Sequence, residues 1–408
     1  MKKAVFTTAD ILLPDGIPFE KWSVIACDQF SSEMGYWERV RDTVSGTPST
    51  FNMIIPEVYL EGIDEEAVIG GISKAMDDYL ESGILRRIED SYIYVERTLA
   101  DGRVRRGIVG AIDLEEYEFS GGQAAILASE GTVIERLPAR IRVRSAAKLE
   151  TPHIITFIND KDGTVIEPLS EKSSRLQLLY DFKLMEGGGH IRGMRVTGDD
   201  ADEVMAAMRA LHEKNRTLMV MGDGNHSLAA AKVYWDELKQ SLSDDEKETN
   251  PARRALLEVN NVYDPAISFE AIHRVVFDTD PEALVNALKN ALPQGTDYNL
   301  SWIAQDQNGT FSVSADCIGD MLTALQIFLD EYTETTNSRI DYIHGADAVK
   351  ALTREKRRLG LILSAMDKSE LFATVANRGV FPKKSFSVGH ARDKRYYLEC
   401  RTIKDVNS

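Results

Sequence analysis

The sequence predicts an α+β or mixed α/β fold, in which mixed sheets with hairpins pack against helices. Strand-forming residues flank Asp101-Gly102 and Asp162-Gly163, which is the pattern of tight β-hairpins. Helix-like and strand-like segments alternate in the last third of the chain. Length and pattern together predict three regions. They are an N-terminal α/β region with a hairpin over 1–150, a central region over 151–278 and a C-terminal α/β region over 279–408.

The first elements follow from short apolar runs and their spacing. A polar turn that begins at Asp28 precedes a helix expected around Tyr36–Thr43. The run Phe51–Ile55 predicts a strand that Pro56 stops. Apolar residues at helical spacing predict a helix over 64–83.

The two predicted hairpins frame a basic stretch. Their strands are Tyr92–Val95 with Arg106–Val109, and His153–Ile158 with Thr164–Ile166. Between them, Arg140–Arg144 is predicted to be extended. The alternation of strand side chains would then place its three arginines on one face.

The central unit is a helix, a strand, a loop and a second helix. Asp199–Glu213 is predicted helical, because acidic residues fill its first turn and suit the helix dipole. Thr217–Met221 predicts a buried strand, Gly222–His226 a loop, and Ser227 onward a helix that reaches about Ser241. An exposed connection is expected over 242–250.

The remaining chain continues this alternation. Strands are expected near Leu256–Val262, Ala271–Phe277, Thr310–Ser314, Arg339–Ile343, Leu359–Leu363 and Arg395–Arg401, helices over Pro281–Ala291, Asp320–Glu331, Ala346–Glu355 and Lys368–Asn377, and a loop over Phe381–Ser385.

Composition restricts the class of function. The 408 residues carry 48 Lys and Arg against 65 Asp and Glu, a net charge of −17, which repels phosphate backbones and argues against nucleic-acid binding. A local basic pocket can still hold a small anion. Three scattered cysteines indicate a reducing compartment, and the sequence shows neither a signal peptide nor a membrane-spanning run, so a cytoplasmic protein is expected.

The loop Gly222-Asp223-Gly224-Asn225-His226 is the strongest functional candidate. Helix N-termini present unpaired N–H groups and a partial positive charge, and glycines let a ligand approach the backbone. Asp223 can bind Mg²⁺ or accept a proton, and His226 can contact phosphate or shuttle a proton. The alternative is a tight turn in which Asp223 or Asn225 caps the helix.

Four further groups are candidates for the same site. Arg140 can pair with phosphate or carboxylate, or it can lie on a solvated edge strand. His273 and Arg274 lie in one predicted strand, where a hydrogen-bonded buried His is the alternative. Lys383-Lys384-Ser385 forms a basic loop that can bind phosphate or face solvent, and Asp28 is either a site acid or a helix cap. Gly187–His190 lacks the Lys and the helix of a phosphate loop and is interpreted as a hairpin turn.

An ordered series of segments resembles the prokaryotic family called domain of unknown function 1015. It comprises Asp28, Ser129-Glu130-Gly131-Thr132 with Arg140, Gly222–His226 with Ala229-Ala230, Val259-Asn260-Asn261, His273-Arg274-Val275, Asp341–His344 and Phe381–Ser385. The family loop reads Asp-Gly-His-His-Arg, whereas this chain has Asp223-Gly224-Asn225-His226-Ser227 and therefore resembles a divergent branch.

The same loop is similar to an element of ParB-like and sulfiredoxin-like nucleotide-binding domains, a group that includes a free-serine kinase. The resemblance implies a ParB/sulfiredoxin-like element around 199–241. It further implies a nucleotide-dependent phosphotransferase that uses Mg²⁺ and ATP or ADP on a small hydroxylated metabolite such as serine. In that role, Asp223, His226 and Asp28 would be catalytic. Gly222, Gly224, Asn225, Ser227, Arg140, His273, Arg274, Lys383, Lys384 and Ser385 would bind phosphate or nucleotide.

Two other hypotheses stay open. One is a nucleotide- or metabolite-sensing protein without turnover, which the loss of the loop Arg favours. The other is a metal-dependent hydrolase that uses Asp28, Asp223 and His226.

Overall fold

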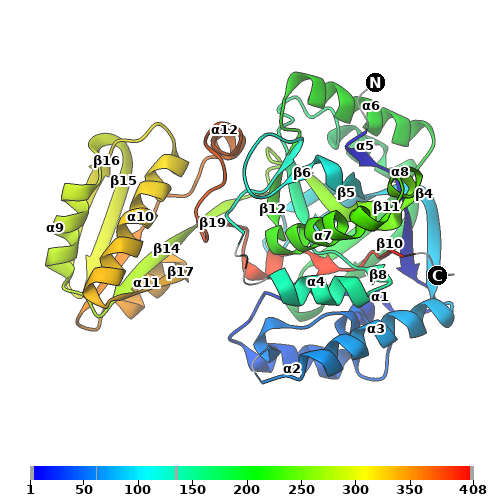
Figure 1. Cartoon of the computed structure of the whole chain (residues 1–408), viewed down its shortest axis with the longest axis horizontal. Coiled ribbons are helices and arrows are strands. Elements are labelled where there is room, and N and C mark those ends of the chain that lie inside the picture. Colours follow the sequence, from blue (N-terminus) through cyan, green and yellow to red (C-terminus); the bar gives the residue numbers. More distant parts are fainter. Residues whose placement is uncertain (1–3, 61, 133, 135–136, 405–408) are drawn as a thin grey trace.

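The mixed α/β class is confirmed by the computed structural model, which describes residues 4–60, 62–132, 134 and 137–404. Two main sheets, each with its own helices, form a larger and a smaller body (Figure 1). The chain passes from one body to the other at β14 (Phe269–Phe277) and returns after β19 (Phe386–Val388).

The larger sheet is mixed, as predicted. Its strand order is β10-β11-β4-β5-β13-β9-β12-β7-β6, with β1 beside β5 and β2 beside β4. The pairs β13–β9, β12–β7 and β6–β7 are parallel, and the others are antiparallel. Its strands are β1 (Phe6–Thr7), β2 (Ala9–Pro14), β4 (Leu85–Thr98), β5 (Val104–Asp113), β6 (Tyr117–Glu118), β7 (Ile126–Leu127), β9 (Ile155–Ile158), β10 (Gln177–Lys183), β11 (His190–Val196), β12 (Met219–Asp223) and β13 (Arg254–Asn261).

The smaller sheet has the order β16-β15-β18-β14-β17, and β19 pairs with the start of β14. Two short ribbons tie the C-terminal segment to the larger body: β20 pairs with β3, and β21 with β8. The strands not yet given are β3 (Val24–Ile25), β8 (Leu149–Glu150), β15 (Gln294–Ala304), β16 (Gln307–Val313), β17 (Arg339–His344), β18 (Arg358–Ile362), β20 (Tyr396–Tyr397) and β21 (Arg401–Thr402).

Helices cover both sheets. In the larger body α7 packs against α4, and α4 packs against α3 (Figure 1). The helices are α1 (Phe19–Trp22), α2 (Met34–Val44), α3 (Glu65–Glu81), α4 (Leu137–Ala146), α5 (Glu167–Lys172), α6 (Asp199–Lys214), α7 (Asn225–Leu238), α8 (Asp244–Thr249), α9 (Pro281–Ala291), α10 (Ile318–Thr336), α11 (Ala346–Leu352) and α12 (Lys368–Arg378).

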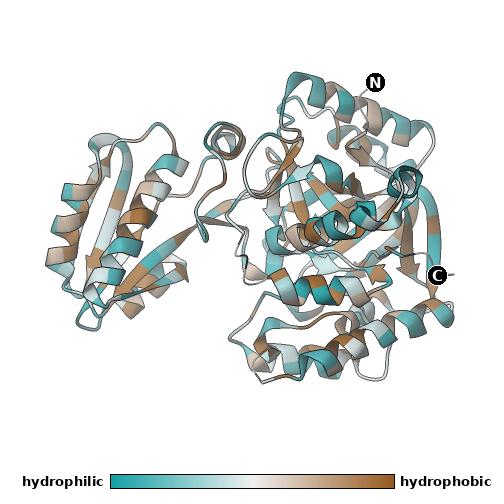
Figure 2. Ribbon diagram, in the orientation of Figure 1, coloured by the Kyte–Doolittle hydropathy of each residue, from teal (hydrophilic) through white to brown (hydrophobic). Residues whose placement is uncertain are grey.

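Three large apolar clusters hold these layers together. Two lie on opposite faces of the larger sheet, and the third fills the smaller body and reaches β12 through Val220. Hydrophobic stretches of the ribbon run along the central strands of the larger body (Figure 2). Of the residues that the structure describes, none belongs to a helix long and apolar enough to cross a bilayer.

The first predicted hairpin is confirmed, and the second is wrong. β4 and β5 pair across Asp101-Gly102, where Gly102 has a φ of +87°. The second Asp-Gly turn leads instead into α5, because the carboxylate of Asp160 accepts the N–H groups of Thr164 and Val165 at 2.6 and 2.9 Å. These hydrogen bonds occupy the backbone N–H groups that would otherwise donate to a neighbouring strand.

The predicted strand Phe51–Ile55 is also wrong. Residues Thr50–Met53 form a 3-10 turn, because the Ser49 hydroxyl caps it by accepting the N–H of Phe51. A short apolar run cannot distinguish a strand from such a turn by its periodicity.

The predicted extended stretch Arg140–Arg144 belongs to helix α4. Leu137 and Ile141 lie one helical turn apart and pack against Ala229 and Ala230 of α7. Arg140 and Arg144 therefore lie one helical turn apart on one face, and Arg142 lies on another. Each of the three pairs with a different acid, namely Glu57, Glu150 and Glu65 respectively. The burial of the Leu137–Ile141 stripe overrides the strand-like alternation of Ile141 and Val143.

Smaller differences concern single elements. Strands β2, β10, β11 and β15 were not predicted, and the exposed connection over 242–250 contains α8, which starts with a Ser243–Glu246 capping box. The predicted strand Arg395–Arg401 is divided between β20 and β21.

Candidate functional site

A cleft of about 720 Å³ lies where the two bodies meet. Its walls come from the turn after β3, the end of β12, the start of α7, and the segments around β17 and β19. Among the residues proposed from the sequence, those that line it are Asp28, Arg140, Gly222, Asp223, Gly224, Asn225, His226, Ser227, Lys383 and Lys384.

The junction between β12 and α7 is tighter than the predicted loop. β12 ends at Asp223, Gly224 adopts a left-handed φ of +81°, and α7 begins at Asn225. A Cβ at Gly224 would lie 3.0 Å from Ile154, so both the backbone conformation and the close packing favour glycine here. No side chain of the described residues caps α7, so its first N–H groups face the cleft as an anion-compatible end.

Asp223 forms an ion pair with Lys394, a residue that the sequence interpretation did not select. The Lys394 Nζ lies 3.2 Å from Asp223 Oδ2, and the two side chains are 9% and 14% exposed. Asp223 Oδ1 accepts the N–H of Gly224 at 2.8 Å. The buried Oδ2 accepts no hydrogen bond among the described residues, and the charge that it faces is the Lys394 ammonium. Among the described residues, no three His, Cys, Asp or Glu side chains form a group suited to a metal ion.

Asn225 joins the start of α7 to the neighbouring segment. Its Oδ1 accepts the N–H of Ser129 at 3.2 Å, and its Nδ2 donates to the Ser129 hydroxyl at 3.2 Å. Ser129 is fully buried, and its carbonyl accepts the N–H of Phe381 at 2.8 Å. Asn225, which stands where the family loop has its first histidine, therefore positions the backbone of Ser129 beside the cleft.

The loop Lys383–Ser385 surrounds a carboxylate of the protein itself. Glu130 accepts the N–H groups of Lys384, Ser385 and Phe386 at 3.2, 2.9 and 3.3 Å. Burial raises the pKa of Glu130, and the three N–H bonds oppose that rise only in part. The backbone donors of this loop are thus occupied, and Lys383 and Lys384 are what it adds to the cleft lining. Ser385 is buried beside the cleft and donates to the Pro382 carbonyl at 2.7 Å.

Asp28 is held in its ionised form. Burial acts to raise the pKa of this carboxyl group, but the net shift is downward because His153, the Gln29 amide at 3.0 Å and Lys394 favour the charged form. An aspartate with a lowered pKa is ionised near neutral pH, so it accepts hydrogen bonds and does not act as a general acid.

His273 and Arg274 lie outside the cleft lining. His273 is buried and its Nδ1 accepts the N–H of Leu363 at 3.2 Å, which is the structural role that the sequence left open. The Arg274 guanidinium packs over the Tyr342 ring at 4.5 Å.

The neighbouring strand β17 contributes His344 to the cleft instead. Burial, Lys384 and Lys394 lower the pKa of His344 below its usual 6.5. In the sequence, His344 stands out only as the last residue of Asp341–His344, one of the segments that resemble the family.

Arg140 stands at the edge of the cleft. Its Nη2 lies 3.0 Å from Glu57 Oε1, and both side chains are about a quarter exposed, at 27% and 22%. The pair closes the side of the cleft that α4 faces.

Comparison with known proteins gave a family and several solved structures. The model of the family described as "Protein of unknown function (DUF1015)" matches residues 14–390. A C-terminally truncated SbnI from Staphylococcus aureus is 8% identical, with a TM-score of 0.38, and the match covers 69% of this chain and 82% of that one. A free serine kinase variant in complex with AMP is 11% identical, with a TM-score of 0.40 and coverage of 72% and 91%. A conserved hypothetical protein from Pyrococcus furiosus is 12% identical, with a TM-score of 0.35 and coverage of 72% and 94%. Among curated proteins there was no match.

Proposed function

Because the chain belongs to the family described as "Protein of unknown function (DUF1015)", whose description states no activity, we propose a function from the cleft itself. The protein binds a phosphorylated ligand of nucleotide size and transfers a phosphoryl group to a small hydroxylated metabolite. The observation that carries this proposal is the uncapped start of α7, which opens into the cleft beside the Asp223–Lys394 pair.

The cleft supplies the charges that phosphoryl transfer needs. The α7 N-terminus with Lys384 and Lys394 offers donors to phosphate oxygens, and His226 stands on the first turn of the same helix. A volume of about 720 Å³ is in the range of small-molecule sites.

Asp28 supplies the acceptor of a proton. The hydroxyl oxygen of the metabolite forms a bond to phosphorus while the bond from phosphorus to the leaving nucleotide oxygen breaks, and the ionised Asp28 accepts the hydroxyl proton. Asp223 positions Lys394 through their ion pair. Because Asp223 is paired with Lys394, we assign no step to a metal ion at Asp223.

The experiment combines binding and turnover. ATP, ADP and AMP are added to the full chain in a thermal-shift series, and labelled ATP or ADP is then incubated with L-serine and with polyols. Asp223→Asn and His226→Ala should each lower transfer by about 10²–10³-fold, the usual loss when one donor to a developing charge is removed. Asp236→Asn, on the exposed side of α7, and His212→Ala on α6 are the matched controls and should leave transfer unchanged.

A sensing protein without turnover is the second candidate. It is favoured by Asn225, whose amide holds Ser129 where the family loop has a histidine. Nucleotide-dependent stabilisation without transfer to any acceptor would support the sensor. Transfer that survives both site substitutions would place the chemistry elsewhere.

A further inference from the structure

Two buried arginines, here called the arginine pair, hold the short segment that carries Lys394. Arg97 on β4 and Arg105 on β5 are opposite each other in the register of the two strands, and they are only 1% and 4% exposed. Neither lines the cleft. Burial and the nearby charge of Arg105 lower the pKa of Arg97 to about 10, so Arg97 stays charged near neutral pH. Burying two like charges is costly unless their donors find acceptors, so the acceptors show what the pair stabilises.

The acceptors are three consecutive backbone carbonyls. Arg97 donates through Nη2 to the carbonyl of Arg392 at 2.9 Å and through Nη1 to that of Lys394 at 3.1 Å. Arg105 donates through Nη1 to the carbonyl of Asp393, which lies between them, at 2.8 Å. The pair therefore fixes the backbone of 392–394 at each of its peptide groups.

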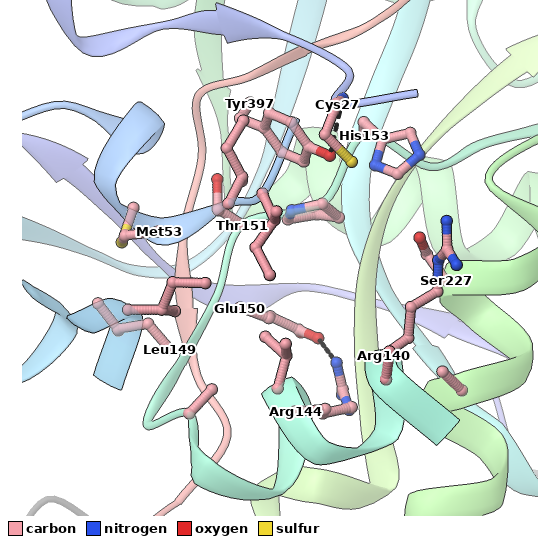
Figure 3. A pocket seen from close by; sticks show the side chains of 18 of the residues that line it. Cys27, Met53, Arg140, Arg144, Leu149, Glu150, Thr151, His153, Ser227 and Tyr397 are labelled. Atoms are coloured by element: carbon pink, nitrogen blue, oxygen red, sulfur yellow. Dashed lines mark hydrogen bonds and ion pairs between the residues drawn. The ribbon is translucent and has the colours of Figure 1, made fainter. Parts of the chain in front are cut away.

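The chain after Lys394 is held from the other side. The carbonyl of Arg395 accepts the N–H of Ala26 at 3.1 Å, and the Tyr397 hydroxyl accepts the N–H of Cys27 at 3.2 Å (Figure 3). Both N–H groups belong to the chain just after β3, which leads into the cleft wall. The backbone of Lys394 is thus held between the arginine pair and the end of β3.

This backbone determines where the Lys394 ammonium lies. A lysine carries its charge at the end of a long flexible chain, so the charge is placed reproducibly only where the backbone and the surroundings of the chain are fixed. The side chain of Lys394 is enclosed, and its Nζ faces Asp223 in the cleft. A shift of 392–394 would move the ammonium away from Asp223 and weaken their attraction, which falls with distance.

We propose that Arg97 and Arg105 are positioning residues, which set the place of the Lys394 ammonium in the cleft by holding the carbonyls of 392–394. Arg97 has the larger share, because it spans two of these carbonyls and also donates through Nε and Nη2 to the carbonyl of Gly188, at 3.0 and 2.6 Å. This inference deepens the proposed function, and it rests on that function only for the phosphate that Lys394 would hold.

The test reads the position of Lys394 through the titration of His344. Burial lowers the pKa of His344, Lys384 and Lys394 lower it further, and Glu270 opposes them. Arg97→Lys keeps a positive charge but has one nitrogen in place of the three that Arg97 uses. It should therefore displace Lys394 and raise the pKa of His344, in the direction of Lys394→Met and by no more than that variant does. NMR titration of the imidazole signals in the full chain, without nucleotide, measures both shifts.

A double variant shows whether Arg97 acts through Lys394. Arg97→Lys should add no further shift of His344 in the Lys394→Met background, because the charge that it displaces is already absent. Arg105 donates to the segment through one nitrogen, so Arg105→Lys can keep that bond and should leave the titration of His344 unchanged, whereas Arg105→Met should raise its pKa. The Arg105 variants break at most one of the bonds and decide the question if Arg97→Lys does not fold.

Arg401→Lys is the matched control. Arg401 is also buried in the late segment and donates to two carbonyls, those of Pro251 and Arg254, but to none of 392–394. Its substitution should lower the free energy of unfolding and leave the pKa of His344 unchanged. A general loosening of the fold would move His344 in this variant too.

Three results would overturn the proposal: an unchanged pKa of His344 in Arg97→Lys and Arg105→Met, a shift that persists in the Lys394→Met background, or an equal shift in Arg401→Lys. None of these readings needs nucleotide or turnover. Failure of phosphoryl transfer and failure of this inference are therefore separable.

Discussion

His344 is the residue whose titration reports most directly on the charges of the cleft. Burial, Lys384 and Lys394 all disfavour its protonated form, and Glu270 opposes them weakly. A histidine with a lowered folded pKa binds its proton less readily than the unfolded chain does. Its contribution to stability is therefore present above pH 6.5 and is lost as the pH falls below that value.

Removing one of these charges should move the titration of His344. Lys384→Met takes away a nearby positive charge, so the pKa of His344 should rise and the loss of stability on acidification should become smaller. An NMR titration of the imidazole signals measures the shift. Lys383→Met is the matched control, because Lys383 lies in the same loop but is not among the charges that act on His344. Equal shifts in the two variants would contradict the arrangement of this loop.

At the scale of elements, the junction between β12 and α7 depends on a glycine with two constraints. Gly224 and Gly345 each precede a helix and each have a φ of +81°. A Cβ at Gly224 would meet Ile154, whereas nothing lies within 4 Å of a Cβ at Gly345. The backbone also differs, because ψ is +24° at Gly224, a left-handed helical conformation, and +131° at Gly345.

Alanine at these two positions should have unequal effects. Gly345→Ala should lower the free energy of unfolding by roughly 1–3 kcal/mol, the cost of a sparsely populated backbone conformation, and should leave nucleotide-dependent stabilisation intact. Gly224→Ala should lower the free energy of unfolding by about 1 kcal/mol for its left-handed backbone and roughly 1 kcal/mol more because Ile154 must move, and it should also abolish nucleotide-dependent stabilisation. Denaturant titrations with and without ATP measure both effects. Loss of the ATP effect in Gly345→Ala would contradict the assignment of the site to α7.

The elements show why part of this structure was predictable from the sequence. The β12–α7 unit was found because a buried apolar run, two glycines and a helical run follow one another locally. Helix α4 was missed because the alternation of Ile141 and Val143 mimics a strand, and only the packing of Leu137 and Ile141 against α7 decides. Lys394 was missed because it reaches Asp223 through contacts between distant segments, which no local pattern records.

At the scale of the whole molecule, Glu130 joins the two bodies. It follows Ser129 on the larger body, and its carboxylate holds the three N–H groups of 384–386 beside the smaller sheet. The Glu130–Phe381 bridge adds backbone pairing at the same place. The wall of the cleft that carries Lys384 is therefore held by one side chain together with the backbone pairing at Phe381.

Truncating that side chain should loosen this wall selectively. Glu130→Ala should speed hydrogen exchange at the amides of 384–386, because they lose their acceptor, while exchange in the central strands stays slow. Glu118→Ala is the matched control: Glu118 also accepts two backbone N–H groups, but those of Phe119 and Ser120. Mass spectrometry of peptides across both segments reads the result. Unchanged exchange at 384–386 in Glu130→Ala would show that other contacts hold the loop.

The ribbons β20–β3 and β21–β8 place a late segment of the chain against two much earlier ones, and Trp22 donates to the carbonyl of Leu398 at 2.8 Å. Lys394 enters the cleft as part of this late segment. During synthesis, domains fold as the chain emerges, so α7 and Asp223 leave the ribosome well before Lys394 does. A nascent chain stopped before residue 394 can contain the glycine turn and the start of α7 but holds an Asp223 without its lysine. The anion site is therefore finished only after Lys394 has left the ribosome.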